Sequence, residues 1–351
     1  MGNMNKFTSI NRFLTESIIN ILLLSIFFLI CMGMGYGVLN RFDPGTLAAL
    51  NDTAFYSAIV INGIDGVSAD FPNRILVPYL GHLIYLIAPE IQSWNMVNFS
   101  LLVVNSFFTA LSTMLILNMS LRITRNIEYS IISCLFFLLN FHVINLYLVS
   151  YIDSAYGFSL LLLIYCLLYN RLLFLPLVAI FGCLVKEVFL PIGSSMLLGS
   201  IIFEFYKHKN IELLKVLIFI LFMMIGLITI TSVDIFMGKN TYLYWNDFTN
   251  NTSSVSPDIT VTNILTNIIK FMFTMGWVII LAVPSLKKLP PSITFSSMFA
   301  SIAAIFLGWV AGVGGADYAR FIYVPAAFII SLASAISISE IVKAYKSNLQ
   351  I

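Results

Sequence analysis

The chain alternates long apolar runs with short polar segments. The first run, 17–40, is 24 residues long and contains no charged residue, and roughly 20 apolar residues suffice for a helix to cross the hydrocarbon core of a bilayer. The same pattern recurs to the C-terminal region and predicts about ten spans, near 17–40, 97–121, 129–149, 154–170, 172–190, 191–206, 216–233, 263–283, 292–312 and 319–339. The sequence therefore predicts an all-α polytopic membrane protein.

Composition excludes a soluble globule. Hydrophobic residues make up 60% of the chain and charged residues 10%, whereas soluble domains carry about 25% charged residues. The four cysteines all lie in apolar runs, so we expect neither a disulfide nor a zinc site. The net charge of +2 gives no reason to expect nucleic acid as a partner. The sequence shows neither an internal repeat nor a linker between domains, so residues 1–351 are predicted to form a single domain in a lipid bilayer.

The basic residues predict the orientation. The apolar segment 75–89 is too short for a span and is expected to be interfacial or re-entrant. Twelve of the eighteen Lys and Arg residues then fall on one side, which is predicted to be cytoplasmic and to carry both termini. All nine aspartates fall on the other side, where two long loops, 41–92 and 234–263, are expected. Either a site lies on this outer face, or short loops there use Asp as a turn former.

The first outer loop holds the most specific pattern, Asn51-Asp52-Thr53-Ala54-Phe55-Tyr56, followed by Asn73-Arg74-Ile75-Leu76-Val77-Pro78. Asp52 and Tyr56 are four residues apart, so on a helix both side chains face the same way. The alternative is that Asp52 only caps this helix. Arg74 is a candidate phosphate-binding residue, and the alternative is that it only anchors the following apolar segment at the membrane interface.

Two later stretches carry ionisable residues in or beside apolar spans. Asp153 opens one predicted helix, and Lys186-Glu187 lies near the outer end of the next. Such residues are costly in a membrane and are treated as functional by default, although Lys186 could instead snorkel to the interface. The third stretch, Gly312 to Pro325, contains Arg320. Its guanidinium offers a planar fork of donors and would bind phosphate well; the alternative is a surface ion pair with Asp317, which would contribute little.

These three stretches, in this order, resemble the GT-C superfamily of membrane glycosyltransferases, which includes the protein O-mannosyltransferases and the aminoarabinose transferases of lipid A. The resemblance implies helices on the membrane surface in the first outer loop. It also implies that Asp52 is the catalytic base beside a polyprenyl-phosphate sugar. The substrate-binding residues would be Tyr56, Arg74, Asp153, Lys186, Glu187 and Arg320. Lys186 and Arg320, with Arg74 as a further candidate, would stabilise the departing phosphate, and Glu187 would hold or balance Lys186.

One departure from the family pattern concerns metal binding. The family usually has a second acidic residue beside the first, but Thr53 follows Asp52 here. A metal held by an adjacent acidic pair is therefore not indicated, and no cofactor is expected. His82 and His142 lie in apolar surroundings and are predicted to be core residues.

The predicted function is a glycosyltransferase of the bacterial inner membrane that makes cell-surface polysaccharide or lipopolysaccharide. It would move a sugar from a polyprenyl-phosphate donor to a glycan or lipid-linked acceptor on the periplasmic face. One alternative is a transporter or flippase of a lipid-linked sugar, for which we would expect inverted repeats and broken helices. The other is a non-catalytic subunit of a glycan assembly complex.

Overall fold

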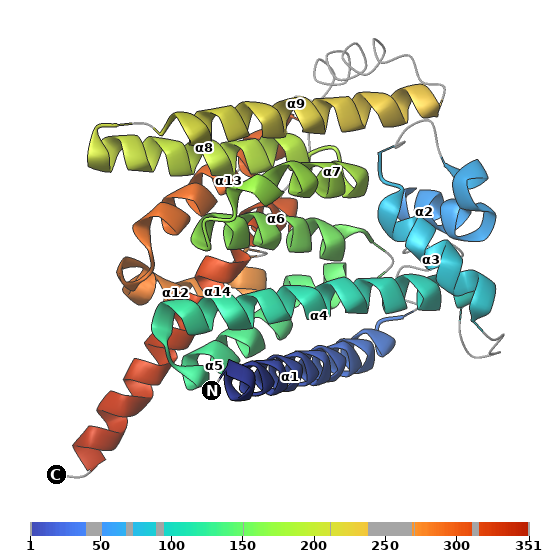
Figure 1. Cartoon of the computed structure of the whole chain (residues 1–351). Coiled ribbons are helices and arrows are strands. Elements are labelled where there is room, and N and C mark those ends of the chain that lie inside the picture. The colour runs from blue at the N-terminus through green and yellow to red at the C-terminus, as the bar shows by residue number, and fades with distance from the viewer. Residues whose placement is uncertain are drawn as a thin grey trace.

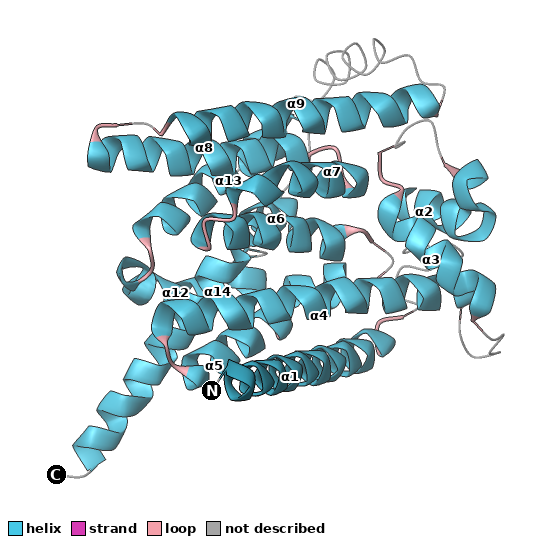
Figure 2. Ribbon diagram, viewed as in Figure 1, coloured by secondary structure: helices cyan, strands magenta, loops and turns pink. Residues whose placement is uncertain are grey.

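The computed structural model describes residues 2–39, 51–67, 73–88, 95–149, 151–210, 212–237, 269, 271–310 and 316–349. Within these ranges the chain is helical apart from turns and short connections, and it contains no strand (Figures 1 and 2). The all-α class predicted from the apolar runs is therefore confirmed.

The described part of the chain folds into α-helices of two lengths. The longer ones are α1 (Gly2–Tyr36), α4 (Met96–Thr124), α8 (Phe189–His208), α9 (Leu213–Phe236), α13 (Pro291–Val310) and α14 (Ala316–Leu349). The shorter ones are α2 (Asn51–Asn62), α3 (Leu76–Ile87), α5 (Ile127–Leu138), α6 (Asp153–Leu168), α7 (Leu175–Val185) and α12 (Trp277–Ala282). Single turns of other helix types lie at η1 (Gly63–Gly66), η2 (Val143–Tyr147), η3 (Leu172–Phe174), η4 (Met272–Gly276) and η5 (Val283–Lys288).

In the described part of the chain, six helices are long and apolar enough to cross a membrane. They correspond to the predicted spans that begin at residues 17, 97, 191, 216, 292 and 319. Three other predicted spans are shorter helices here, because 129–149 is interrupted after Leu138, α6 has 16 residues and α7 has 11. Of the predicted span 263–283, residues 263–268 and 270 lie outside the described residues, and most of the rest forms η4 and the short helix α12. The structure therefore shows a polytopic membrane protein, and the number of ten spans stays a prediction.

The helices differ in how much of their apolar surface is buried. Only 11% of the spanning window of α1 and 17% of that of α9 is buried, against 78% for α4 and 83% for α14. In water such exposed apolar helices would be unstable, so α1 and α9 are positioned to face lipid. Helices α8 and α13 pack closely: a Cβ added at Gly199 would lie 3.0 Å from Phe299, the small-residue contact common in membrane bundles.

Much of the first outer loop is folded. Helices α2 and α3 pack on each other and on α4, and they lie together at one end of the helix bundle (Figure 1). The second predicted loop is described only for residues 234–237. There, Asp234 accepts a hydrogen bond from the Asn73 amide at 3.0 Å, which joins the two loops.

Candidate functional site

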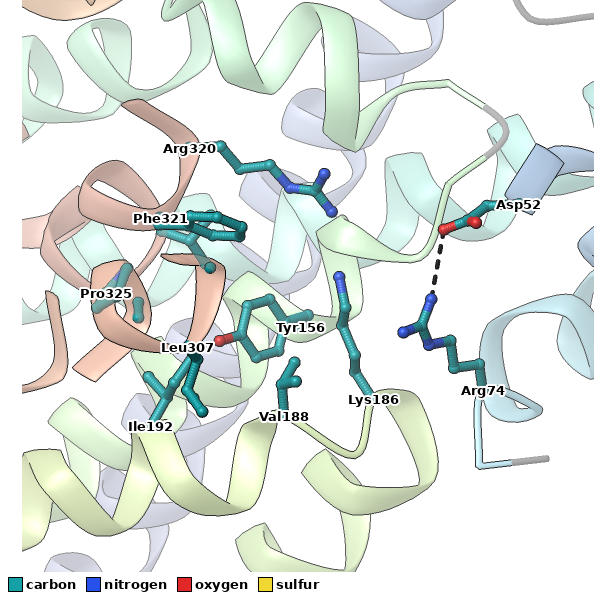
Figure 3. A pocket seen from close by; sticks show the side chains of 13 residues that line it. Asp52, Arg74, Tyr156, Lys186, Val188, Ile192, Leu307, Arg320, Phe321 and Pro325 are labelled. Atoms are coloured by element: carbon teal, nitrogen blue, oxygen red, sulfur yellow. Dashed lines mark hydrogen bonds and ion pairs between the residues drawn. The ribbon is translucent and has the colours of Figure 1, made fainter. Parts of the chain in front are cut away.

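A cavity of about 270 Å³ lies where the first outer loop meets the helix bundle. Four charged residues contribute to its wall, and Figure 3 shows the Lys186 side chain projecting between Arg320 on one side and Arg74 with Asp52 on the other. The remaining wall is mainly apolar and comes from helices α6, α8, α13 and α14 and the turn before α8, through Tyr156, Val188, Ile192, Ala304, Leu307, Gly308, Phe321, Val324 and Pro325. Residues from distant parts of the sequence thus converge on one hollow.

The first charged group is centred on Arg74. Its guanidinium donates to both carboxylate oxygens of Glu187, with the shortest contact at 2.6 Å from Nη2 to Oε1. Its Nη1 reaches Asp52 Oδ2 at 3.3 Å and the Tyr56 hydroxyl at 3.4 Å. The prediction that Asp52 and Tyr56 face the same way is confirmed, because one nitrogen of Arg74 contacts both. Arg74 therefore does more than anchor α3 at an interface.

The second charged group is centred on Asp153, whose side chain is only 1% exposed. Arg320 Nη2 donates to both of its oxygens at 2.8 Å, and Lys186 Nζ lies 3.4 Å from Oδ1. The Lys186 ammonium also lies 5.4 Å from the centre of the Tyr156 ring, within the range of a cation–π contact. One partner of Arg320 is thus a buried carboxylate 167 positions away in the sequence, and the side chain of Asp317, the alternative partner, is not among those that the structure describes.

At the turn between α7 and α8, one ion pair expected from the sequence is wrong. We expected Glu187 to balance its neighbour Lys186, but Glu187 forms its ion pair with Arg74 and Lys186 forms its own with Asp153. Lys186 has extended backbone angles, φ −162° and ψ 126°. Successive side chains of an extended chain point to opposite sides, so these two residues serve different groups.

Burial and charge act in opposite directions on Glu187. Its removal from water favours the protonated acid, but the charge of Arg74 and the hydrogen bonds from it outweigh this effect and lower the pKa of the Glu187 carboxyl. Glu187 therefore stays ionised and holds Arg74 in place. Burial also raises the pKa of the Tyr56 phenol, so Tyr56 keeps its proton.

Asp52 differs from the other two carboxylates because its side chain is 40% exposed, against 13% for Glu187 and 1% for Asp153. It lies in the first turn of α2, where the helix dipole favours a negative charge. This position is compatible with a helix-capping role, yet the carboxylate also lines the cavity. Asp52 is thus the acidic group of the cluster that an incoming molecule can reach most easily.

Sequence reasoning missed the residue that holds Asp153 in place. Asn105, fully buried on α4, donates to the carbonyl oxygens of Val149 at 2.5 Å and Tyr151 at 2.8 Å, and it accepts from the Ser154 hydroxyl at 2.5 Å. These bonds fix the turn from which Asp153 projects. The sequence signal that could have identified Asn105 is an Asn inside an apolar span, because a buried side-chain amide needs several hydrogen-bond partners.

The apolar wall of the cavity was also missed, because its residues look like ordinary span residues in the sequence.

No family model matches this chain, and no curated protein matches it in sequence. The geometry of the site therefore carries the functional argument alone. Among the described residues, no group of three or more His, Cys, Asp and Glu side chains could hold a metal ion.

The two histidines have different surroundings. His82 Nδ1 hydrogen-bonds the Val60 carbonyl at 2.9 Å, as expected of a packed, partly buried histidine. His142 is 2% exposed and stacks on Tyr323 with the ring centres 5.4 Å apart. Within the part of the chain described, neither of its ring nitrogens has a hydrogen-bond partner. His142 is therefore a core residue whose imidazole is held by packing, while its backbone amide donates to the Asn140 side chain at 2.9 Å.

Proposed function

We propose that this protein is a GT-C-like membrane glycosyltransferase that moves a sugar from a polyprenyl-phosphate donor to a glycan or lipid-linked acceptor. The observation that carries the proposal is the cavity lined both by the accessible carboxylate of Asp52 and by the cations Lys186 and Arg320. A transfer of this kind needs a base for the acceptor hydroxyl and positive charge for the departing phosphate.

The distribution of charge supports a division of roles across the cavity. Among the described residues, Arg320 and Lys186 lie on one side around the carboxylate of Asp153, two cations to one anion. On the other side Asp52 and Glu187 lie around the guanidinium of Arg74, two anions to one cation. A phosphate is favoured on the first side and a hydroxyl giving up its proton on the second. This assigns Arg74 to holding Asp52 and not to binding phosphate.

The proposed reaction follows from this arrangement. Asp52 takes the proton of the acceptor hydroxyl, and the acceptor oxygen forms a bond to the anomeric carbon of the sugar. The bond from that carbon to the phosphate oxygen breaks, and its electron pair leaves with the phosphate. Lys186 and the planar donor fork of Arg320 stabilise the charge that develops there. No step needs a metal ion, and the apolar wall formed by α13 and α14 suits a prenyl chain next to the phosphate.

The proposal includes a location. If the ten predicted spans and the distribution of Lys and Arg hold, both termini face the cytoplasm and the cavity opens on the periplasmic side of a bacterial inner membrane. Helices α2 and α3 would then lie over the periplasmic surface of the inner membrane. A lipid-linked donor reaches such a site from within the bilayer, and a cell-surface polysaccharide or lipopolysaccharide acceptor from the periplasm.

The test is the glycan profile, by mass spectrometry, of host cells that carry the wild-type chain or Asp52→Asn at matched membrane levels. We expect the wild type to add a sugar-sized mass and Asp52→Asn to lose it. Asp65→Asn is the matched control, because Asp65 is exposed in the same loop and does not line the cavity. If all three chains add the mass equally, Asp52 is not the base.

If none of the three adds any mass, the transferase proposal fails. Purified protein in vesicles would then be tested for movement of a lipid-linked sugar between leaflets. Movement that requires Lys186 and Arg320 would indicate the flippase, and no movement would indicate a non-catalytic subunit.

A further inference from the structure

A second cavity, of about 530 Å³, lies between α6 and α7 and shares no residue with the first. Its wall is formed by Phe158, Leu162, Tyr165, Cys166, Arg171, Phe174, Leu177, Val178 and Phe181. Along α6 this wall runs from residue 158 to residue 166, or about 12 Å at the rise of an α-helix. Apart from Arg171, the lining is apolar or aromatic, which suits a hydrocarbon chain.

The cavity is closed at one end and open at its side. At the end nearer Asp153, the rings of Phe108, Phe158 and Phe181 contact one another with centres 5.8 Å apart. Along the side, Phe174 is 54% exposed and Leu177 is 61% exposed. These side chains form a rim on the outer surface of the bundle, where a membrane helix meets lipid. A hydrocarbon chain can therefore enter from the bilayer and ends against the phenylalanine cluster.

The other end of the cavity carries positive charge. Arg171 lines it directly and follows Asn170, whose left-handed φ of 53° turns the chain at the end of α6. The Arg171 amide donates to the Cys166 carbonyl at 2.7 Å, which holds the turn against the helix. Neither Arg171 nor Arg122 forms an ion pair with a carboxylate of the described residues.

Arg122 reaches the same end through two tyrosines. Its guanidinium lies 4.2 Å from the centre of the Tyr169 ring, and Tyr169 stacks on Tyr165 at 4.3 Å. Tyr165 is part of the cavity wall, and the Tyr169 hydroxyl donates to the Asn118 carbonyl at 3.2 Å. The stacked rings therefore fix a second cation beside the Arg171 end of the apolar cavity.

We propose that this cavity binds one anionic phospholipid, with its phosphate at Arg171 and Arg122 and one acyl chain between α6 and α7. Basic pockets between membrane helices on the cytoplasmic side are suited to anionic head groups. The 16 residues of α6 put this end roughly 24 Å from the Asp153 end. It is also the end that the Lys and Arg distribution assigns to the cytoplasm. The inference does not depend on the proposed transferase activity.

The test is lipid binding to the purified full chain, measured by native mass spectrometry with phosphatidylglycerol and phosphatidylcholine of identical acyl chains. We expect one tightly bound phosphatidylglycerol and weaker binding of phosphatidylcholine. Arg122→Gln/Arg171→Gln should weaken phosphatidylglycerol binding roughly tenfold or more, since each basic residue near an anionic head group contributes about 1 kcal/mol. Binding of phosphatidylcholine should not change, which also reports that the variant is folded.

The matched control is Lys207→Gln/Lys209→Gln. It removes the same charge at the end of α8, and neither residue lines the cavity. This variant should bind both lipids as the wild type does. Leu162→Trp, which fills part of the cavity, should weaken both lipids. Equal binding of the two lipids by the wild type would overturn the proposal. Displacement of phosphatidylglycerol by glycerol phosphate at equal concentration would also overturn it, because the acyl chain would then contribute nothing.

Discussion

The buried carboxylate of Asp153 offers the sharpest test of how the charged site is held together. Asp153→Asn keeps the size of the side chain but removes the charge that Arg320 and Lys186 share. Two cations whose side chains are 18% and 13% exposed would then face one another without a carboxylate between them. Breaking a buried pair by removing one partner costs about 3–5 kcal/mol, because the remaining charge is buried without compensation.

The comparison variant is Glu204→Gln, which removes an acidic partner of Lys215. That pair is more exposed, with Glu204 at 29%, and Lys215 keeps a second carboxylate, Glu212, at 3.4 Å. We expect a loss of at most about 1 kcal/mol, as is usual for exposed ion pairs. In a domain of this size 1 kcal/mol corresponds to a shift of about 2 °C in the unfolding midpoint.

The assay is thermal unfolding of the purified proteins in one detergent at one heating rate. Asp153→Asn should lower the midpoint by at least about 5 °C and Glu204→Gln by about 2 °C or less. Adding Arg320→Gln to Asp153→Asn should recover part of the loss, because the second change removes one of the two cations that lost the Asp153 carboxylate. Equal shifts for Asp153→Asn and Glu204→Gln, or strict additivity in the double variant, would refute the reasoning.

Two further predictions concern packing and pH. Gly157→Ala on α6 should destabilise the protein by about 1–3 kcal/mol in the same unfolding assay, because a Cβ there would collide with the buried Tyr147 hydroxyl. The control is Gly33→Ala, where an added Cβ has no atom within 4 Å; this change should be neutral or stabilising. Burial lowers the pKa of Lys186, which lies in the turn between α7 and α8, to about 8, helped by repulsion from Arg320 and opposed by Asp153. Lys186 is therefore charged below pH 8 and loses its charge above it. Transfer activity should fall as the pH rises through 8, and Lys186→Arg should keep its activity to higher pH; the same fall in Lys186→Arg would contradict the role given to Lys186.

Part of the site could be predicted from local spacing. Asp52 and Tyr56 are four residues apart, so a single helix was enough to put them on the same face, and both contact Arg74. Asp153 was expected at the start of a helix and opens α6. These inferences hold because helix geometry depends on residues that are close in sequence.

The pairing of charges could not be predicted in this way. Arg74 and Glu187 are 113 positions apart, and Asp153 and Arg320 are 167 positions apart. The sequence favoured the neighbours Lys186 and Glu187 as partners, but an extended turn sends these two side chains in opposite directions. Asn105 was overlooked for the same reason, since its hydrogen bonds join α4 to a turn about 45 residues later.

The sequence by itself determined the class of protein and its helical construction, because the length and charge content of apolar runs are local properties that a bilayer selects directly. Only the tertiary structure decided which charges meet, which carboxylate stays accessible and where the two cavities lie. The physical reason is that a buried charge must find an opposite charge or hydrogen bonds. Which partner it finds depends on how helices far apart in sequence pack together.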